Sequence, residues 1–109
     1  MRYAIASDGT QVAPHFGRCE QYELVDIEDG AVKHTETMGN PGHAPGLLPR
    51  LLAEREVGVL IAGGAGPRAI GMLGQFGIVT CLGVSGPVGE AVAALTADTL
   101  EPGESACEH

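Results

Sequence analysis

Basic side chains are scarce in this sequence: six Lys and Arg stand against fourteen Asp and Glu, which gives a formal net charge of -8. A surface of this sign repels phosphodiester backbones and anionic lipid, which argues against nucleic acid and membrane surfaces as partners. No apolar run approaches the roughly 20 residues that a bilayer span requires, and the first residues lack the pattern of a signal peptide. We therefore expect a cytoplasmic protein.

Cysteine is scarce as well. Cys19, Cys81 and Cys107 cannot pair completely, and none of them belongs to a Cys-x-x-Cys unit. This excludes a disulfide framework and a four-cysteine structural zinc site, so we expect free thiols. Glycine and proline are abundant instead, at 17 and 7 residues. Because both residue types shape loops, we expect the loops to carry the function.

The 109 residues, 44% of them hydrophobic and 18% charged, fit one compact α/β domain over residues 1–100, followed by a flexible tail over residues 101–109. Apolar and β-prone runs predict five strands, and helical spacing of apolar residues with a Pro or Gly-Pro entry predicts three helices. The expected strands cover residues 2–7, 21–27, 31–38, 57–62 and 78–84, and the helices cover residues 47–56, 67–76 and 88–95. The order β-β-β-α-β-α-β-α predicts an antiparallel meander, a βαβ unit, and a mixed five-stranded sheet with helices on both faces. Residues 39–46 show no periodicity and are expected to form a flexible connection.

The segment His15-Phe16-Gly17-Arg18-Cys19 holds the densest cluster of reactive side chains. Imidazole and thiol bind soft and borderline metals, and a guanidinium neutralises an anionic ligand. Two interpretations stay open, a ligand pair or a loop histidine beside a buried thiol. Cys107 and His109 present the same choice between a metal site and a solvated tail. Cys81 in an apolar run fits a core residue, and His34 fits the surface of an edge strand.

The residues Gly64-Ala65-Gly66-Pro67-Arg68-Ala69 match a dinucleotide fingerprint, but the acid expected about 20 residues later is absent, which excludes that interpretation. The starts of the second and third helices, with Gly64, Gly66 and Arg68, remain a candidate anion site or simple helix-start punctuation. Asp8 follows the first strand, where a two-metal nuclease would place an acid. No partner acid follows the fourth strand, so we do not expect hydrolysis.

Taken together, several motifs resemble the dinitrogenase iron–molybdenum cofactor-binding family, which includes NifX, NafY and the C-terminal domain of NifB. The resemblance runs from Met1 to about Leu100, and the tail Ala106-Cys107-Glu108-His109 is similar to that of small stand-alone members. The matching motifs are Ser7-Asp8-Gly9, His15-Phe16-Gly17-Arg18, Val25-Asp26, the run from Ile61 to Ala69, Gly77-Ile78 and Glu90-Ala91-Val92.

The resemblance implies a ribonuclease H-like fold without nuclease chemistry and a non-enzymatic role in carrying a metal–sulfide cluster, either the iron–molybdenum cofactor, its precursor or a related Mo, Fe or Cu sulfide. His15 matches the family's cluster-binding histidine, and Cys19 is a candidate second ligand by position. Donor or acceptor proteins are the implied partners of a monomer or weak homodimer. The alternative is a regulatory or interaction module without cargo, with residues 39–46 as its contact surface.

Overall fold

The computed structural model describes residues 1–42 and 46–97. His43, Cys107, His109 and the expected tail over residues 101–109 lie outside the described residues. The elements are β1 (Arg2–Asp8), β2 (Gln11–Val12), β3 (Gln21–Glu28), β4 (Ala31–Gly39), α1 (Leu47–Glu54), β5 (Val59–Ile61), α2 (Pro67–Gln75), β6 (Val79–Cys81) and α3 (Val88–Thr96). The predicted α/β class and all three helices are confirmed.

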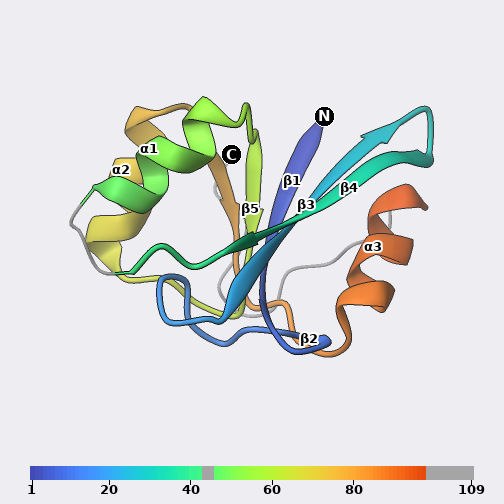
Figure 1. Ribbon diagram of the computed structural model, residues 1–109, viewed down its shortest axis with the longest axis horizontal. Coiled ribbons are helices and arrows are strands. Elements are labelled where there is room, and N and C mark those ends of the chain that lie inside the picture. The colour runs from blue at the N-terminus through green and yellow to red at the C-terminus, as the bar shows by residue number, and fades with distance from the viewer. Residues whose placement is uncertain (43–45, 98–109) are drawn as a thin grey trace.

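The strands form one mixed sheet in the order β4-β3-β1-β5-β6, with β2 paired to β1 (Figure 1). β1, β3 and β4 pair antiparallel, as the predicted meander requires, and β5 lies parallel to both β1 and β6. The predicted count of five strands is wrong, because β2 adds a sixth through the pairs Ser7 with Val12 and Asp8 with Gln11. Two residues are too short to show any periodicity, so sequence patterning places them in a loop.

The two parallel strands after α1 are shorter than predicted. β5 ends before Ala62 and β6 ends before Leu82, although both residues are buried. An apolar run indicates that residues are buried, but it does not indicate that they pair with another strand. Ala62 and Leu82 are buried residues of the loops that follow these strands. The turn after β5 leads to the start of α2, which lines the site described below.

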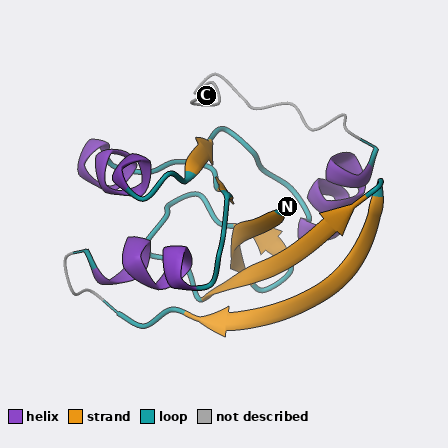
Figure 2. Cartoon of the chain, turned by 90° about the horizontal axis from the view of Figure 1, so that it is seen from above, coloured by secondary structure: helices purple, strands orange, loops and turns teal. Residues whose placement is uncertain are grey.

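The sheet lies between α1 and α2 on one face and α3 on the other, as Figures 1 and 2 show. Alternation along β1 explains the two layers, since Ala4 and Ala6 face one core cluster and Ile5 faces the other. The first cluster includes Leu52 of α1 and Leu73 of α2, and the second includes Ala91 of α3. Helices on both faces are thus confirmed, and the ribonuclease H-like label stays a prediction.

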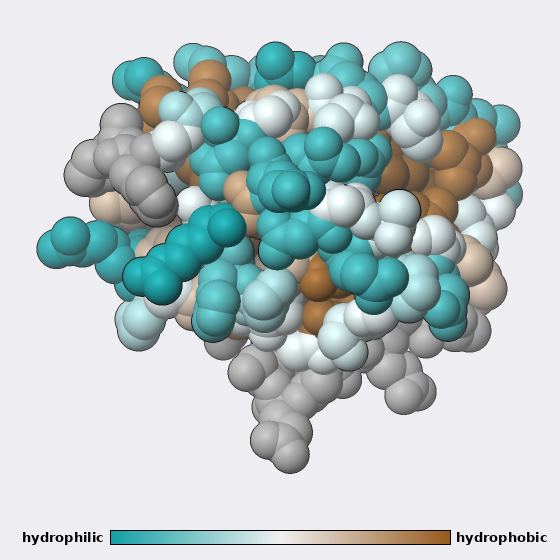
Figure 3. Space-filling view, turned by 60° about the horizontal axis from the view of Figure 1, so that its bottom comes forward, coloured by the Kyte–Doolittle hydropathy of each residue, from teal (hydrophilic) through white to brown (hydrophobic). Residues whose placement is uncertain are grey.

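The outer surface is mostly hydrophilic. Figure 3 shows hydrophilic side chains across the middle of one face, with hydrophobic side chains in separate patches. Large exposed hydrophobic residues are Met1, Val32 and Phe76. No helix in the described part of the chain has the length and apolar character needed to cross a membrane.

Candidate functional site

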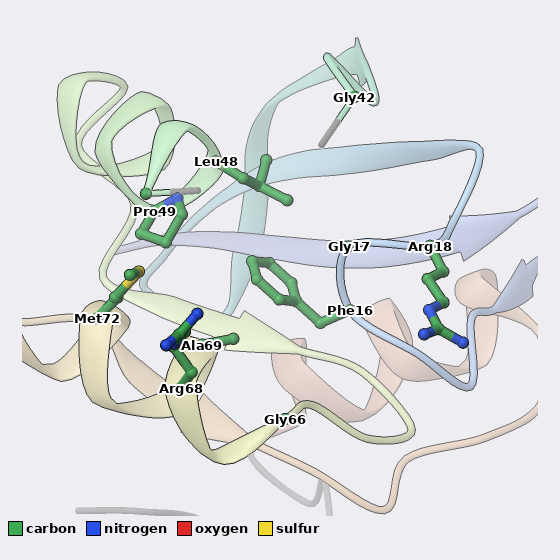
Figure 4. Close-up of a pocket in the computed structure, with 11 residues that line it drawn as sticks. Phe16, Gly17, Arg18, Gly42, Leu48, Pro49, Gly66, Arg68, Ala69 and Met72 are labelled. Atoms are coloured by element: carbon green, nitrogen blue, oxygen red, sulfur yellow. The ribbon is translucent and has the colours of Figure 1, made fainter. Parts of the chain in front are cut away.

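A pocket of about 560 Å³ opens where the loop after β2 faces the starts of α1 and α2 (Figure 4). Phe16, Gly17 and Arg18 form one wall, and residues of α1 and α2 form the opposite one. The complete lining is Phe16, Gly17, Arg18, Gly42, Gly46, Leu48, Pro49, Gly66, Arg68, Ala69 and Met72. The pocket therefore brings together three segments that are far apart in the sequence.

Two helix N-termini border this pocket. α1 starts after Gly46 and α2 after Gly66, both N-cap residues line the pocket, and neither helix has a side-chain cap or an acidic residue in its first turn. The first N–H groups of a helix have no partner within the helix and carry partial positive charge. Such helix ends favour anions, so the pocket is electrostatically suited to a negatively charged ligand.

The start of α3, which sequence analysis grouped with that of α2, lies elsewhere. The N–H of Val88 donates to the carbonyl oxygen of Thr10 at 2.8 Å, and Glu90 places a carboxylate in the first turn of this helix. α3 also covers the opposite face of the sheet. The helix start that lies beside that of α2 at the pocket is instead the start of α1. The sequence did not indicate this pairing, because the starts of α1 and α2 come together only in the folded chain.

Two guanidinium groups reinforce the positive field. Arg18 comes from the loop after β2 and Arg68 from the first turn of α2, and both line the pocket as exposed side chains. Within residues 1–42 and 46–97, the ion pairs join Arg2 to Asp26 and Arg55 to Glu36, so no carboxylate neutralises either pocket arginine there. On a chain of net charge -8, this is a local concentration of positive charge.

The remaining walls are apolar and polarizable. Phe16 lies between the two arginines in the view of Figure 4, and Leu48, Pro49, Ala69 and Met72 complete the surface. A thioether such as that of Met72 is a soft group that adapts to irregular shapes. Apolar walls around a few convergent charges are typical of small-ligand pockets, and here they favour a weakly hydrated anion.

The loop that carries His15 is joined to the turn after β5 by backbone contacts. The N–H of Phe16 donates to the carbonyl oxygen of Gly64, and the N–H of Gly63 donates to that of Ala13, both at 2.8 Å. A Cβ at Gly63 would lie 2.8 Å from Cα of Pro14, so only glycine permits this approach. Of the two predicted glycines, Gly66 lines the pocket, whereas Gly64 holds the neighbouring loop.

Tyr22 of β3 supports the same loop from within the core. Its side chain is fully buried, its hydroxyl accepts a hydrogen bond from the N–H of Gly17 at 3.0 Å, and its ring makes an edge contact with Phe16 at 5.8 Å between centroids. Burial raises the pKa of the Tyr22 hydroxyl well above its ordinary value, and a hydrogen bond with the Cys19 side chain adds to the increase. Tyr22 is therefore a neutral anchor for the pocket wall.

The predicted ligands occupy different environments. His15 is exposed and directly precedes the pocket wall, but it does not line the pocket. Cys19 is 5% exposed and belongs to the core cluster beside Tyr22, so its thiol does not face the pocket, and its role as a ligand stays a prediction. The described residues contain no group of three or more His, Cys, Asp or Glu side chains that could hold a metal ion.

The other reactive residues fit their simpler interpretations. Cys81 is buried in the sheet and His34 is exposed on β4, which pairs only with β3 within the described chain. A carboxylate oxygen of Asp8 accepts a hydrogen bond from the N–H of Glu20 at 2.9 Å, which closes the loop between β1 and β3. No sequence motif singled out Met72, Tyr22 or Asn40, whose side chain donates hydrogen bonds to the carbonyl oxygens of Gly17 and Cys19. Met72 lies four residues after Arg68, a helical spacing that could have linked the two.

Comparison with known proteins agrees with this architecture. The chain is 35% identical over 83 residues to the uncharacterized protein MJ0580 of Methanocaldococcus jannaschii, covering 72% of this chain and 70% of that protein. The crystal structure of PH0822 superposes with a TM-score of 0.87 at 30% identity, covering 96% of each chain. The apo form of the orange protein from Desulfovibrio gigas superposes with a TM-score of 0.75 at 27% identity, covering 99% of this chain and 96% of that one.

The match to a family model confirms the resemblance seen in the motifs. The model described as dinitrogenase iron-molybdenum cofactor matches residues 1–98, which includes every described element and the whole of the pocket. The chain therefore belongs to the dinitrogenase iron–molybdenum cofactor family.

Proposed function

We propose that this protein is a non-enzymatic carrier that holds an anionic metal–sulfide cluster in the pocket between the loop after β2 and the starts of α1 and α2. The cluster is the iron–molybdenum cofactor, its precursor or a related Mo, Fe or Cu sulfide. The observation that carries the proposal is the charge of this pocket. Two arginines without carboxylate partners among the described residues and two uncapped helix starts surround soft, apolar walls. Membership in the family supplies the kind of cargo.

Each part of the pocket has a role in this proposal. Arg18 and Arg68 neutralise the charge of the cluster, and the open N–H groups of the helix starts, with Gly66 at that of α2, donate hydrogen bonds to its sulfides. The carbonyl of Gly64 holds the loop that presents Arg18. Met72 and Phe16 contact the cluster through polarizable surface. This arrangement holds cargo without a complete set of metal–protein bonds.

Side-chain ligands to the metal come from the rim. His15 is exposed beside the pocket wall, and its neutral imidazole is a ligand for borderline metals. Cys19 would reach the cargo only after its thiol leaves the contact with Tyr22. Cys107 and His109 lie outside the described residues, and we propose them as additional ligands from the tail over residues 101–109, with residues 1–100 as the cargo-binding domain.

The partners follow from the role. A carrier takes its cargo from one protein and gives it to another, so we propose donor and acceptor proteins as partners of a cytoplasmic monomer or weak homodimer. The net charge of -8 disfavours nucleic acid. The exposed rim at His15 and Arg18 is the place where a partner would gain access to the cargo.

Anaerobic reconstitution tests the proposal. Purified protein is incubated with ferrous iron, molybdate and sulfide, desalted, and assayed for visible absorption and for metal and sulfide per chain. We expect stoichiometric cluster on the wild type and reduced loading on His15→Ala. His34→Ala is the matched control, since His34 is an exposed histidine on β4.

The outcomes separate the roles of the pocket and of the histidine. A wild type that gains no absorption and no stoichiometric metal would overturn the carrier function. Equal loading of the two histidine variants would remove His15 from the ligand set and leave the charged pocket as the binding element.

A further inference from the structure

Asn40, which directly follows β4, is the only asparagine of the chain, and its side chain makes three hydrogen bonds. Its Nδ2 donates to the carbonyl oxygens of Gly17 at 3.1 Å and Cys19 at 2.8 Å, and its Oδ1 accepts from the N–H of Gly42 at 2.9 Å. Its backbone N–H donates to the carbonyl oxygen of Glu20 at 3.1 Å. One half-buried side chain thus joins residues 17–19 to residues 40–42, two segments that lie about 20 residues apart in the sequence.

Both segments belong to the pocket. Gly17 lies between Phe16 and Arg18 in one wall, and Gly42 contributes to another part of the lining. Both glycines have positive φ, 91° at Gly17 and 104° at Gly42, so the backbone at both places adopts conformations that only glycine adopts readily. Such segments keep a fixed position only when contacts hold them, and Asn40 supplies contacts to both.

The two peptide groups that flank the Cα of Gly17 show how firmly the loop is held. The N–H of Gly17 donates to the buried hydroxyl of Tyr22, and the carbonyl oxygen of Gly17 accepts from Asn40. The residue is therefore held from the core side by β3 and from the surface side by the end of β4. Arg18 follows immediately, so these two contacts fix the main-chain position from which its side chain extends.

We propose that Asn40 is a positioning residue that sets the spacing between the wall carrying Arg18 and the segment carrying Gly42, and thereby how slowly the pocket releases an anionic cluster. The inference rests on the proposed function. An amide is the side chain suited to the task, because it offers two donors and one acceptor at once. A carboxylate keeps the acceptor for Gly42 and loses both donors.

The test compares Asn40→Ala and Asn40→Asp with Thr37→Ala. Thr37 is the control because its exposed hydroxyl hydrogen-bonds Glu23 on the same strand pair and does not line the pocket. The first readout is amide hydrogen exchange of unloaded protein. The Gly42 amide should exchange faster in Asn40→Ala, where it loses its acceptor, and should stay as in the wild type in Asn40→Asp and Thr37→Ala.

The second readout is the rate at which reconstituted cluster is lost to an excess of chelator, measured far below the melting temperature. Both Asn40 variants lose the two hydrogen bonds donated by Nδ2, and at about 1 kcal/mol each this loss predicts an increase on the order of tenfold or more. Asn40→Ala also loses the acceptor for Gly42, and Thr37→Ala should show no increase. A solely structural residue would lower the melting temperature without changing this rate.

The results distinguish the positioning role of Asn40 from the proposed carrier function. If the wild type loads cluster and the Asn40 variants release it at the wild-type rate, the positioning role is overturned and the carrier function stands. If the wild type takes up no cluster, the carrier function fails and the effect on release fails with it. Unchanged exchange of Gly42 in Asn40→Ala would contradict the hydrogen bond that fixes Gly42 to Asn40, and with it the positioning role, in either case.

Discussion

Gly63→Ala tests the close approach between the turn after β5 and the loop that leads to His15. A Cβ at this position would lie 2.8 Å from Cα of Pro14, 3.1 Å from its carbonyl oxygen and 3.2 Å from that of Ala13. All three neighbours are backbone atoms, which cannot rotate away as a side chain can. The φ of Gly63 is not in the left-handed region, so the contact and not the torsion angle determines the result.

The size of the effect follows from the displaced backbone. Overpacking of this kind costs about 1–3 kcal/mol, and in a domain of this length each 1 kcal/mol lowers the melting temperature by roughly 4–8 °C. The hydrogen bond from Gly63 to Ala13 must lengthen as well. Since the loop carries the pocket wall, we also expect Gly63→Ala to reduce cluster loading.

Gly71→Ala is the matched control. Gly71 lies in the middle of α2 and has no heavy atom within 4 Å of an added Cβ. Alanine in a helix interior is more stable than glycine by about 0.5–1 kcal/mol, so the control should raise the melting temperature. The assay is thermal and urea unfolding of both variants with the wild type. If Gly63→Ala is as stable as the wild type, the reasoning from close approach is refuted.

Three further predictions concern the core and two titrating groups. In urea titrations, Tyr22→Phe should lose less stability than the wild type as the pH rises above about 10, because the raised pKa of Tyr22 makes the folded state keep a proton that the unfolded state gives up; equal alkaline slopes would contradict this. The hydrogen bond from Arg2 lowers the pKa of the Asp26 carboxyl, so the advantage of the wild type over Asp26→Asn should be full above about pH 4 and decrease as the pH falls further; a constant difference would contradict it. Leu52→Ala removes a fully buried side chain of α1 and should lower the free energy of unfolding by about 2–5 kcal/mol, whereas a change below about 0.5 kcal/mol, as at an ordinary surface position, would contradict the packing of α1 on the sheet.

Much of the fold could be predicted because apolar spacing and chain punctuation are local. Pro67 and Gly77 bracket α2, and the burial of β1 on both faces follows from its continuous apolar run. β2 could not be predicted, since a two-residue strand exists only through its pairing with the end of β1. The ends of β5 were overestimated because buried residues continue beyond its hydrogen-bonded ladder.

The candidate site could be predicted only in part. Arg18 and Arg68 belong to recognisable motifs, and the structure places both at the pocket. The contribution of α1 to the pocket and the hydrogen bonds from Asn40 to the loop after β2 depend on contacts between distant segments, which no local pattern encodes. Cys19 illustrates the limit: its spacing from His15 is compatible with metal binding, but its burial beside Tyr22 is a property of the core.

The most direct test of the charged pocket is the amount of cluster retained by the double variant Arg18→Gln and Arg68→Gln after anaerobic reconstitution and desalting. Each charge-assisted contact contributes about 1.5–3 kcal/mol, so loss of both should weaken the affinity for the cluster by at least two orders of magnitude. The double variant should therefore retain less cluster, and its retention should depend less on salt. Arg50→Gln removes an exposed arginine of α1 that does not line the pocket and should retain cluster as the wild type does. Retention by the double variant equal to that of Arg50→Gln would contradict the central claim.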